Sequence, residues 1–497
     1  MDILTPALKG IRSVFKMTGK FTNAKNEVIE IPKADFSFVP RAKSEYFSLG
    51  FSKESILPPD VGTKKYYVAG YGDNNPAQGV LDAPHTHAVW IDDHSGKGGI
   101  VIISIDCVGM LNSDVNILRE RLKPFAMRTG CRSINVFATH NHAGIDTMGI
   151  WGQLPLSGRN PRYMELVFSK SVKAVKDAYE NRKQGLLYHG KTEVPDMQED
   201  IRLPIVYSKT LTRLRFVPND GSKETYIINF ASHSESLQGC NSRISADFPC
   251  YMRERIAEKT GANTLYCVGA IGGMISMEIE NEAEIKENGS DFAESTRNIG
   301  RKLADYALAI TDEKQLAPKI SCLRQEFYFE IDNTVLMLAA KAGILKAKDY
   351  HMPGVGLNHM MKSELSYIEI DSLKFVLIPG EIFPELVFGG YLSAEESAQG
   401  YSPEINSKPL VEIADDKDIV VVGLANDEVG YIIPLNDYLL DEKQPYAESP
   451  RDRLGRRHYE ETNSLGPATS QKIADVFADV IRTVNKAKNE FNGSVTV

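Results

Sequence analysis

The sequence predicts an α/β fold in which a mixed central sheet region is flanked by helices. Short Val- and Ile-rich runs bounded by Gly, Asn or Pro are typical of buried strands. These runs alternate with amphipathic segments of helical period, which is the α/β order. Residues 46–497 contain no repeat, low-complexity tract or composition shift that marks a boundary. We therefore expect one large domain there, preceded by an N-terminal appendage at residues 1–45, which has few apolar clusters.

The first half of the domain predicts strands followed by a strand–helix–strand unit. A helix is expected at 113–130, where Ser113 can cap the start and Gly130 ends the apolar pattern. The next strand is INVFATHNH, at 134–142. The preceding strands are expected at 46–59, 66–72, 87–93 and 100–110.

The remaining segments continue the alternation. TLTRLRFVP and TYIINFASH flank NDGS and predict a hairpin. The last segment, 466–489, predicts an amphipathic helix. Further helices are expected at 161–183, 246–261 and 295–311, and further strands at 264–273, 321–331, 373–381 and 419–427.

Charge and composition exclude several classes of protein. The net charge of −9 and pI near 5.7 argue against a nucleic-acid or anionic-membrane partner. No apolar stretch approaches the ~20 residues that span a bilayer, so no integral membrane segment is expected. The amphipathic, basic start, with a plausible helix at 3–15, lacks the apolar core of an export signal. Six cysteines without a CxxC pair suit a reducing compartment. We expect a cytoplasmic protein, although an export signal could have been removed.

Five apolar runs end at a chemically useful residue. They end at His140, His233, Ser276, Glu381 and Tyr431. Ligands of open α/β sheets bind outside the carboxyl ends of the strands, so these side chains could gather at one edge. Neutral imidazoles and a carboxylate are the usual ligands of catalytic zinc. Together the five runs predict a hydrolytic metal site.

Each residue taken alone has a plainer interpretation. His140 and His142 would share one face of a strand, but an isolated HxH motif is weak. A histidine can be satisfied by hydrogen bonds, Glu381 can form a salt bridge, and Ser276 can be a turn residue. Tyr431 can be a core tyrosine with a bonded hydroxyl. A second HxH, His85 and His87, is expected to be structural, and the segment with His351 and His359 to be a loop near the pocket.

Ten motifs follow one another from about residue 47 to about residue 467: GFSKESILPP, YVAGYG, IVIISIDCVGM, VFATHNHAG, NFASHSES, SADFPCYMRERI, VGAIGGMIS, IPGEIFPE, NDEVGYIIP and HYEETNSLGP. In this order they resemble the neutral/alkaline, non-lysosomal ceramidase family. The resemblance implies a zinc ion held by His140, His233, Glu381 and Tyr431. It implies that His142 faces the substrate and that Ser276 is the catalytic hydroxyl. With this zinc ion, Tyr431 and His142 would also help to stabilise the oxyanion. The family cleaves the amide of ceramide into sphingosine and a fatty acid.

The chain also departs from the family. The family's THTHSGP segment is THNHAGI in this chain, and the family's GDVSP turn is GGMIS. The metal ligands survive while the substrate neighbourhood changes, so a soluble amide is also conceivable. The family's C-terminal immunoglobulin-like domain is expected to be absent, since the residues after Pro467 predict a helix.

The sequence therefore predicts a zinc-dependent amidohydrolase with a small-molecule N-acyl or ceramide-like substrate, which would belong to sphingolipid metabolism. Two alternatives stay open. One is a metallo-esterase acting on a small soluble substrate, and the other is a non-catalytic scaffold that binds a lipid or a sugar. The oligomeric state is not predicted.

Overall fold

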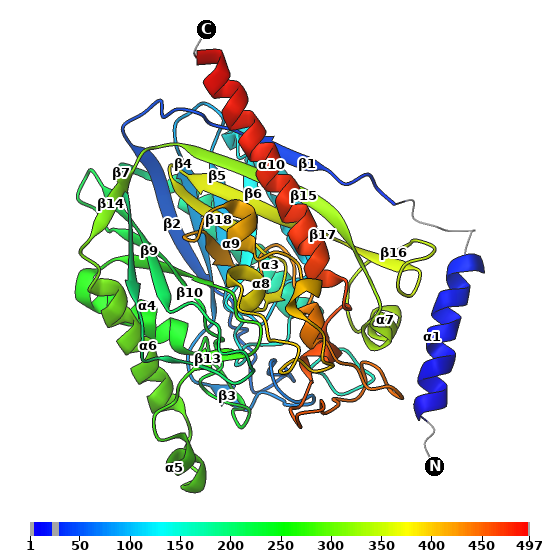
Figure 1. The fold of residues 1–497 in the computed structure, drawn as a ribbon. Helices are drawn as coiled ribbons and strands as arrows, with labels where there is room; N and C mark the ends of the chain where they lie inside the picture. The colour runs from blue at the N-terminus through cyan, green and yellow to red at the C-terminus, as the bar shows by residue number, and fades with distance from the viewer. Residues whose placement is uncertain (1–3, 22–28, 496–497) are drawn as a thin grey trace.

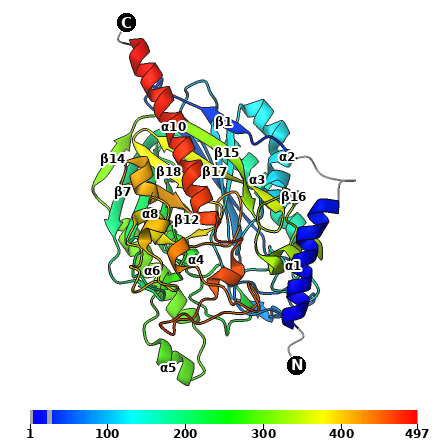
Figure 2. The same ribbon diagram turned by 45° about the vertical axis from the view of Figure 1, so that its right-hand side comes forward.

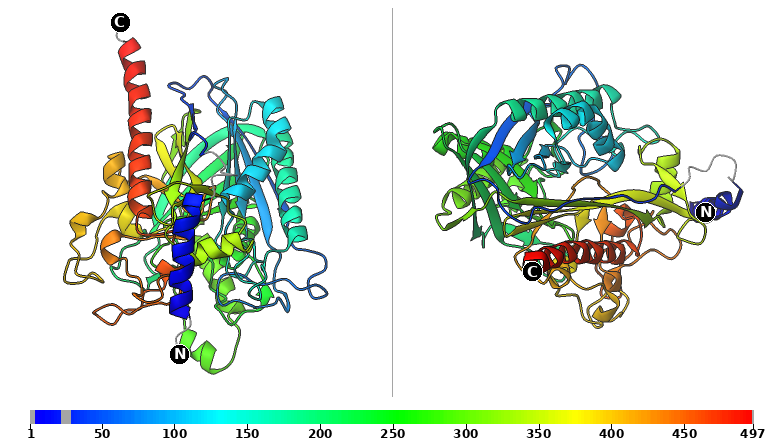
Figure 3. Two further views of the ribbon diagram at one scale, coloured as in Figure 1. Left: turned by 90° about the vertical axis from the view of Figure 1, so that its right-hand side faces the viewer. Right: turned by 90° about the horizontal axis from the view of Figure 1, so that it is seen from above.

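Two β-sheets pack face to face, and helices cover the outer face of each (Figure 1). The computed structural model describes residues 4–21 and 29–495. Viewed from above, the layers follow one another as helices, sheet, sheet and helices (Figure 3). The predicted α/β class with helices flanking a mixed sheet region is confirmed.

Within the described residues, the larger sheet has nine strands in the order β12-β10-β9-β7-β2-β4-β5-β6, with β14 paired to β7. The pairs β5–β6 and β10–β12 are parallel and the others antiparallel. The strands are β2 (Phe47–Ser55), β4 (His85–Asp92), β5 (Ile100–Ile105), β6 (Ser133–Ala138), β7 (Lys183–Glu193), β9 (Thr210–Pro218), β10 (Thr225–Phe230), β12 (Asn263–Val268) and β14 (Glu313–Leu316).

The outer face of this sheet carries four helices with apolar inner faces. Trp90, Val101 and Ile103 of the sheet belong to one buried cluster with Leu118, Val167 and other helical residues. The helices are α2 (Asn112–Thr129), α3 (Pro161–Glu180), α4 (Phe248–Thr260) and α6 (Ala293–Leu308).

The second sheet follows the order β1-β15-β17-β18-β20, with β16 paired to β17. Its outer face packs against α8 (Pro384–Phe388), α9 (Leu410–Ala414) and the long α10 (Thr469–Val495), which runs across it (Figure 2). The strands are β1 (Ala34–Ser37), β15 (Ile320–Glu330), β16 (Asp349–His351), β17 (His359–Ile370), β18 (Leu373–Leu377) and β20 (Val420–Val422).

The inner faces of the two sheets share one apolar core. Phe47, Val89 and Leu214 from the first sheet meet Ile368 and Val422 from the second. Because each strand alternates its side chains between faces, one face serves this shared core and the other a helical layer.

Short pairings and small elements complete the fold. The pairings are β3 (Gly79–Val80) with β11 (Arg243–Ile244), β8 (Gln198–Asp200) with β13 (Ile275–Met277), and β19 (Glu381–Ile382) with β21 (Tyr431–Ile432). The remaining helices are α1 (Leu4–Phe21), α5 (Glu282–Glu287), α7 (Thr334–Lys341), and the single turns η1 (Pro403–Ile405), η2 (Leu435–Asp437) and η3 (Glu460–Asn463).

Most predicted elements are present, including the hairpin of β9 and β10 and the final helix. Gly130 ends α2 in the left-handed conformation, as predicted, but Leu111 rather than Ser113 precedes its first residue, and Ser113 donates to Lys346 O instead. Residues 66–72 form isolated bridges rather than a strand.

The expected appendage, residues 1–45, contacts the helix α7 and adds a strand to the second sheet. Its helix α1 lies beside α7, where Arg12 forms an ion pair with Asp332 (Figures 1 and 2). Its strand β1 pairs antiparallel with β15. In the part of the chain that the structure describes, no helix combines the length and apolarity needed to cross a bilayer.

Candidate metal centre

The segments that follow β6 and β10 meet although these strands are far apart in the sheet order. The sheet curls so that β12 approaches β4, β5 and β6. Beyond the strands, Asn141 and Ser234 form a parallel bridge, and the His142 N–H donates to Ser234 O at 2.9 Å. This backbone contact brings His140 and His142 next to His233.

Three imidazoles and a carboxylate converge at this point. His142 Nε2 lies 3.0 Å from His140 Nε2, and Glu381 Oε2 lies 3.1 Å from His233 Nε2 and 3.3 Å from His140 Nε2. All four side chains are buried. Among the described residues, the three histidines form a group whose ligand atoms lie within 4.8 Å of one another. Four predicted site residues are therefore brought together.

The backbone orients two of the rings. His140 Nδ1 is 2.8 Å from Val108 O, and His233 Nδ1 is 2.9 Å from Ile275 O. A carbonyl only accepts hydrogen bonds, so each Nδ1 carries the proton and each neutral ring presents an Nε2 lone pair. Both lone pairs then point at the Glu381 carboxylate, which also only accepts. Such an arrangement is stable only with a cation between them or with protonated rings.

The donor set fits a metal ion. Ligand atoms of a tetrahedral zinc site with bonds of ~2.0–2.1 Å are about 3.3–3.4 Å apart. Three distances are close to this value: 3.0 Å from His142 Nε2 to His140 Nε2, and 3.1 and 3.3 Å from Glu381 Oε2 to His233 Nε2 and His140 Nε2. The ligand atoms of the three histidines all lie within 4.8 Å of one another. Nitrogen and carboxylate ligands suit zinc among the common catalytic metals.

Electrostatics within the cluster are strongly coupled. Burial alone would raise the pKa of Glu381, but His140 and His233 outweigh it and hold that pKa well below its ordinary value. Burial and the neighbouring His140 lower the pKa of His142 to about 4. His142 is therefore a neutral ring near pH 7, and a neutral ring is the form that binds a metal or accepts a proton.

Tyr431 has a different contact from the one predicted. It lies opposite Glu381 in the pairing of β19 with β21, but its hydroxyl donates to Met274 Sδ at 3.1 Å. The phenol is buried beside the cluster without a hydrogen bond to its members. Its role as a metal ligand stays a prediction.

Ser276 belongs to a second group of side chains next to the histidines. Its hydroxyl donates to Glu235 Oε1. Glu235 Oε2 accepts from the Tyr71 hydroxyl at 2.9 Å and lies 3.3 Å from His142 Nδ1. Burial alone would raise the pKa of Glu235, but His142, His233 and the Ser276 hydroxyl outweigh it and hold that pKa well below its ordinary value. Glu235 therefore connects the predicted hydroxyl to the imidazoles as an ionised acceptor.

Glu235 was not singled out from the sequence. It lies two residues after His233 in the hydroxyl-rich stretch ASHSES, which resembles an exposed loop. Its neighbours Ser232, His233, Ser234 and Ser236 are buried in the structure, but a polar stretch carries no sequence pattern that indicates burial, so no local signal identifies Glu235.

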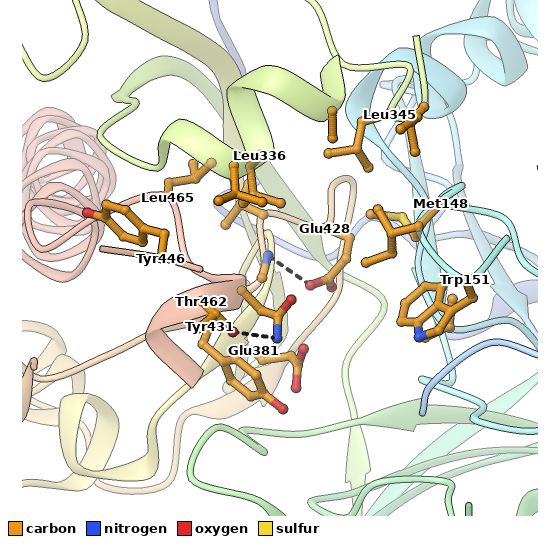
Figure 4. Close-up of a pocket in the computed structure, with 18 of the residues that line it drawn as sticks. Met148, Trp151, Leu336, Leu345, Glu381, Glu428, Tyr431, Tyr446, Thr462 and Leu465 are labelled. Carbon is orange, nitrogen blue, oxygen red and sulfur yellow. Dashed lines mark hydrogen bonds between the residues drawn. The ribbon is translucent and has the colours of Figure 1, made fainter. Parts of the chain in front are cut away.

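A cavity of about 1060 Å³ opens onto the cluster (Figure 4). Glu381 and Tyr431 lie in one part of its wall, and Leu336, Leu345 and Met148 lie in another. The apolar part comes from α7, the loop after it and residues 148–154. A long apolar group with a polar end would match this division of the wall.

The other histidines lie elsewhere. His87 is buried and its Nδ1 is 3.4 Å from Arg253, which forms an ion pair with Asp106. This environment is that of a structural histidine. His351 and His359 pair with each other where β16 ends and β17 begins, and residues 352–358 between them form the expected loop.

Known proteins support the resemblance seen in the sequence. No protein-family profile matches the chain. The neutral ceramidase of Drosophila pseudoobscura pseudoobscura is 21% identical over 323 residues, which are 54% of this chain and 45% of that protein. The chain thus spans less than half of that relative.

Solved structures extend the comparison to the fold. A crystal structure of the neutral ceramidase from Pseudomonas aeruginosa matches with a TM-score of 0.66 at 15% identity, covering 90% of this chain and 75% of the other. A structure described as a ceramidase complexed with C2 matches with a TM-score of 0.64 at 15% identity, covering 89% and 76%. The predicted resemblance to the neutral ceramidases is confirmed, and the chain shares their fold.

Proposed function

We propose that this chain, which shares the fold of the neutral ceramidases, is a zinc-dependent hydrolase that cleaves the amide bond of N-acylated, lipid-like substrates. One observation carries the proposal. The Nε2 atoms of His140 and His233 converge on the Glu381 carboxylate at the polar wall of a largely apolar cavity. Buried lone pairs that face a carboxylate call for a cation, and the cavity offers room for an acyl chain.

The metal would be held by His140, His233 and Glu381. His142 is a candidate for the fourth position by its distance, and Tyr431 by the resemblance to the family. A zinc ion bound there supplies a Lewis acid that polarises a carbonyl and lowers the pKa of bound water. These effects are the ones that amide hydrolysis needs near neutral pH.

The chain's own side chains would position the reacting groups. Glu235 Oε1 accepts the hydrogen bond of the Ser276 hydroxyl and so fixes the orientation of that hydroxyl. Tyr71 holds the other oxygen of Glu235, which limits rotation of the carboxylate. If Tyr431 rather than His142 takes the fourth metal position, the neutral His142 ring keeps its Nε2 lone pair and would accept or return a proton there.

The substrate class follows from the cavity and from the relatives. The wall away from the cluster is formed by Leu336, Leu345, Met148 and similar side chains, which suit an aliphatic chain. The similar proteins are named ceramidases. A ceramide-like amide is therefore the first substrate to test, which would place the chain in sphingolipid metabolism.

Metal analysis combined with a substrate panel tests the proposal. The panel contains N-acyl amino alcohols of graded chain length, matched esters and a small soluble amide. We expect about one zinc per chain and a kcat/KM that rises with acyl length for the amides. Faster cleavage of esters or of the small amide would instead favour the metallo-esterase or a soluble substrate. Absence of zinc after reconstitution, with binding but no turnover, would favour a non-catalytic scaffold.

A further inference from the structure

Glu428 is a buried carboxylate with one oxygen left without a partner. Its Oε1 accepts from the Gly430 N–H at 2.9 Å, while Oε2 has no hydrogen-bond partner among the described residues. The residue is 8% exposed. Neither the metal cluster nor the Ser276 group uses it.

The carboxylate belongs to the wall of the cavity that opens onto the cluster. Figure 4 shows it between the apolar side chains of Leu336 and Met148 and the polar wall with Glu381. The Glu428 side chain packs closely against the backbone of Gly109, since a Cβ added at Gly109 would lie only 2.7 Å from Glu428 Cγ. Glycine at 109 thus makes room for this carboxylate, and the bond from Gly430 sets its orientation.

A buried polar atom without a partner is costly, and the cost disappears when a ligand supplies the missing hydrogen bond. The neighbouring wall is apolar, so the ligand group must reach Oε2 while the rest of the ligand lies against aliphatic side chains. A hydroxyl meets this demand better than an ammonium, because it enters an apolar cavity at a smaller desolvation cost.

We propose that Glu428 determines substrate specificity by hydrogen bonding a hydroxyl group carried by the amine part of the substrate, near the scissile amide. This inference deepens the proposed amide hydrolysis and rests on it for the identity of the amide. It assigns the recognised molecules to N-acyl amino alcohols rather than to simple N-acyl amines.

Binding can be measured without turnover, since Trp151 lines the cavity and its fluorescence should respond to an occupant (Figure 4). Two non-hydrolysable sulfonamide analogues serve as probes: one of a long-chain amino alcohol, and one of the same amine with hydrogen in place of the hydroxyl. We expect the zinc-loaded wild type to bind the hydroxylated probe about 10- to 100-fold more tightly.

Glu428→Leu should bind both probes with similar affinity, and Glu428→Gln should keep part of the preference because an amide still forms hydrogen bonds. Glu385→Gln is the matched control: Glu385 is a buried glutamate that does not line the cavity, and its substitution should leave the preference unchanged. Thermal midpoints and zinc content verify that each variant is folded and loaded.

The inference is overturned if the wild type shows no preference, if neither probe binds, or if Glu428→Leu keeps the full preference. Failure of the proposed function has a separate signature. In that case no N-acyl substrate is hydrolysed, whatever the preference between the probes. Turnover of the hydroxylated and deoxy amides by the same variants provides a second readout, in which kcat/KM ratios should follow the ratios of Kd.

Discussion

Glu381 and Tyr431 lie directly opposite each other in the parallel pairing of β19 with β21. The Glu381 N–H donates to Gly430 O at 3.1 Å, and the Phe383 N–H donates to Ile432 O at 3.1 Å. The hydrogen-bonded pair of short strands thus places both side chains in the wall of the cavity. Within it, the carboxylate reaches two imidazoles while the phenol donates to Met274 Sδ. The two residues share a position in the fold, but only the carboxylate contacts the histidines.

Replacing Glu381 should remove metal and activity together. Glu381→Gln keeps the volume of the side chain but replaces the charged oxygen between His140 and His233 with a neutral amide. Loss of an outer hydrogen bond to a metal ligand already costs ~10- to 100-fold in affinity, so loss of a ligand should cost at least about 100-fold. Zinc titration and turnover measure both effects. Unchanged zinc affinity in this variant would contradict the proposed centre, and Glu385→Gln should keep both zinc and activity.

Replacing Ser276 should separate metal binding from turnover. Ser276→Ala removes the hydroxyl that donates to Glu235 without touching the histidines, so zinc should stay bound. If the hydroxyl takes part in proton transfer, kcat should fall by roughly 10²-fold or more. Glu235→Gln should produce a similar fall, because it weakens the acceptor of the same hydrogen bond.

The control for this experiment is Ser363→Ala. The Ser363 hydroxyl also donates a buried hydrogen bond to a carboxylate, Asp427 Oδ2, at 2.7 Å, but it lies outside the histidine cluster. This substitution should change stability more than turnover. A Ser276→Ala enzyme with wild-type kcat would exclude Ser276 from the reaction.

The sequence predicts that the site residues lie at strand ends and gather at one edge, but it does not predict the backbone contact that brings them together. Apolar runs of period two mark where strands stop, and β6 and β10 stop just before His140 and His233. The same-face argument for His140 and His142 was wrong in its premise, since the strand ends at Ala138 and His140 has a φ of 55°. Their rings meet because of the tertiary bridge between Asn141 and Ser234, which has no local signal.

The strand β17 shows a second limit of sequence patterns. It runs from His359 to Ile370, and its polar residues Ser363, Glu364 and Glu369 are buried. Glu364 is paired with Arg119 from α2, far away in the sequence. A buried ion pair masks the apolar alternation that would identify a strand, so the sequence pattern predicts no strand over residues 362–370.

Gly70 should be required because His142 packs against it. A Cβ at this position would meet His142 Cγ at 2.4 Å, and the backbone has a φ of 109°. Gly70→Ala should therefore displace the imidazole and lower kcat. Gly62→Ala is a control for backbone strain alone, because Gly62 has a φ of 89° with open space around it. Equal losses of activity in the two variants would show that strain, and not the contact with His142, is responsible.

Glu385 should make the stability of the protein depend on pH. Burial raises the pKa of this carboxyl to about 8, although the Arg202 guanidinium opposes the shift. Between the ordinary glutamate pKa of about 4.3 and about 8, the folded state holds the proton while the unfolded state has lost it. The free energy of unfolding must then decrease as pH rises through this window, by up to ~1.4 kcal/mol per pH unit from this group.

Glu385→Gln replaces the neutral acid with a neutral amide of the same shape, so it removes this dependence while Asp200 and other buried acids remain in both proteins. The thermal midpoint of the wild type should therefore fall more between pH 5 and pH 8 than that of the variant. The difference between the two midpoints should be smallest near pH 5. Below about pH 4.3 the group is protonated in both states and contributes no slope. Parallel midpoint curves across the window, or a steeper fall in the variant, would show that Glu385 is already ionised in the folded protein near neutral pH.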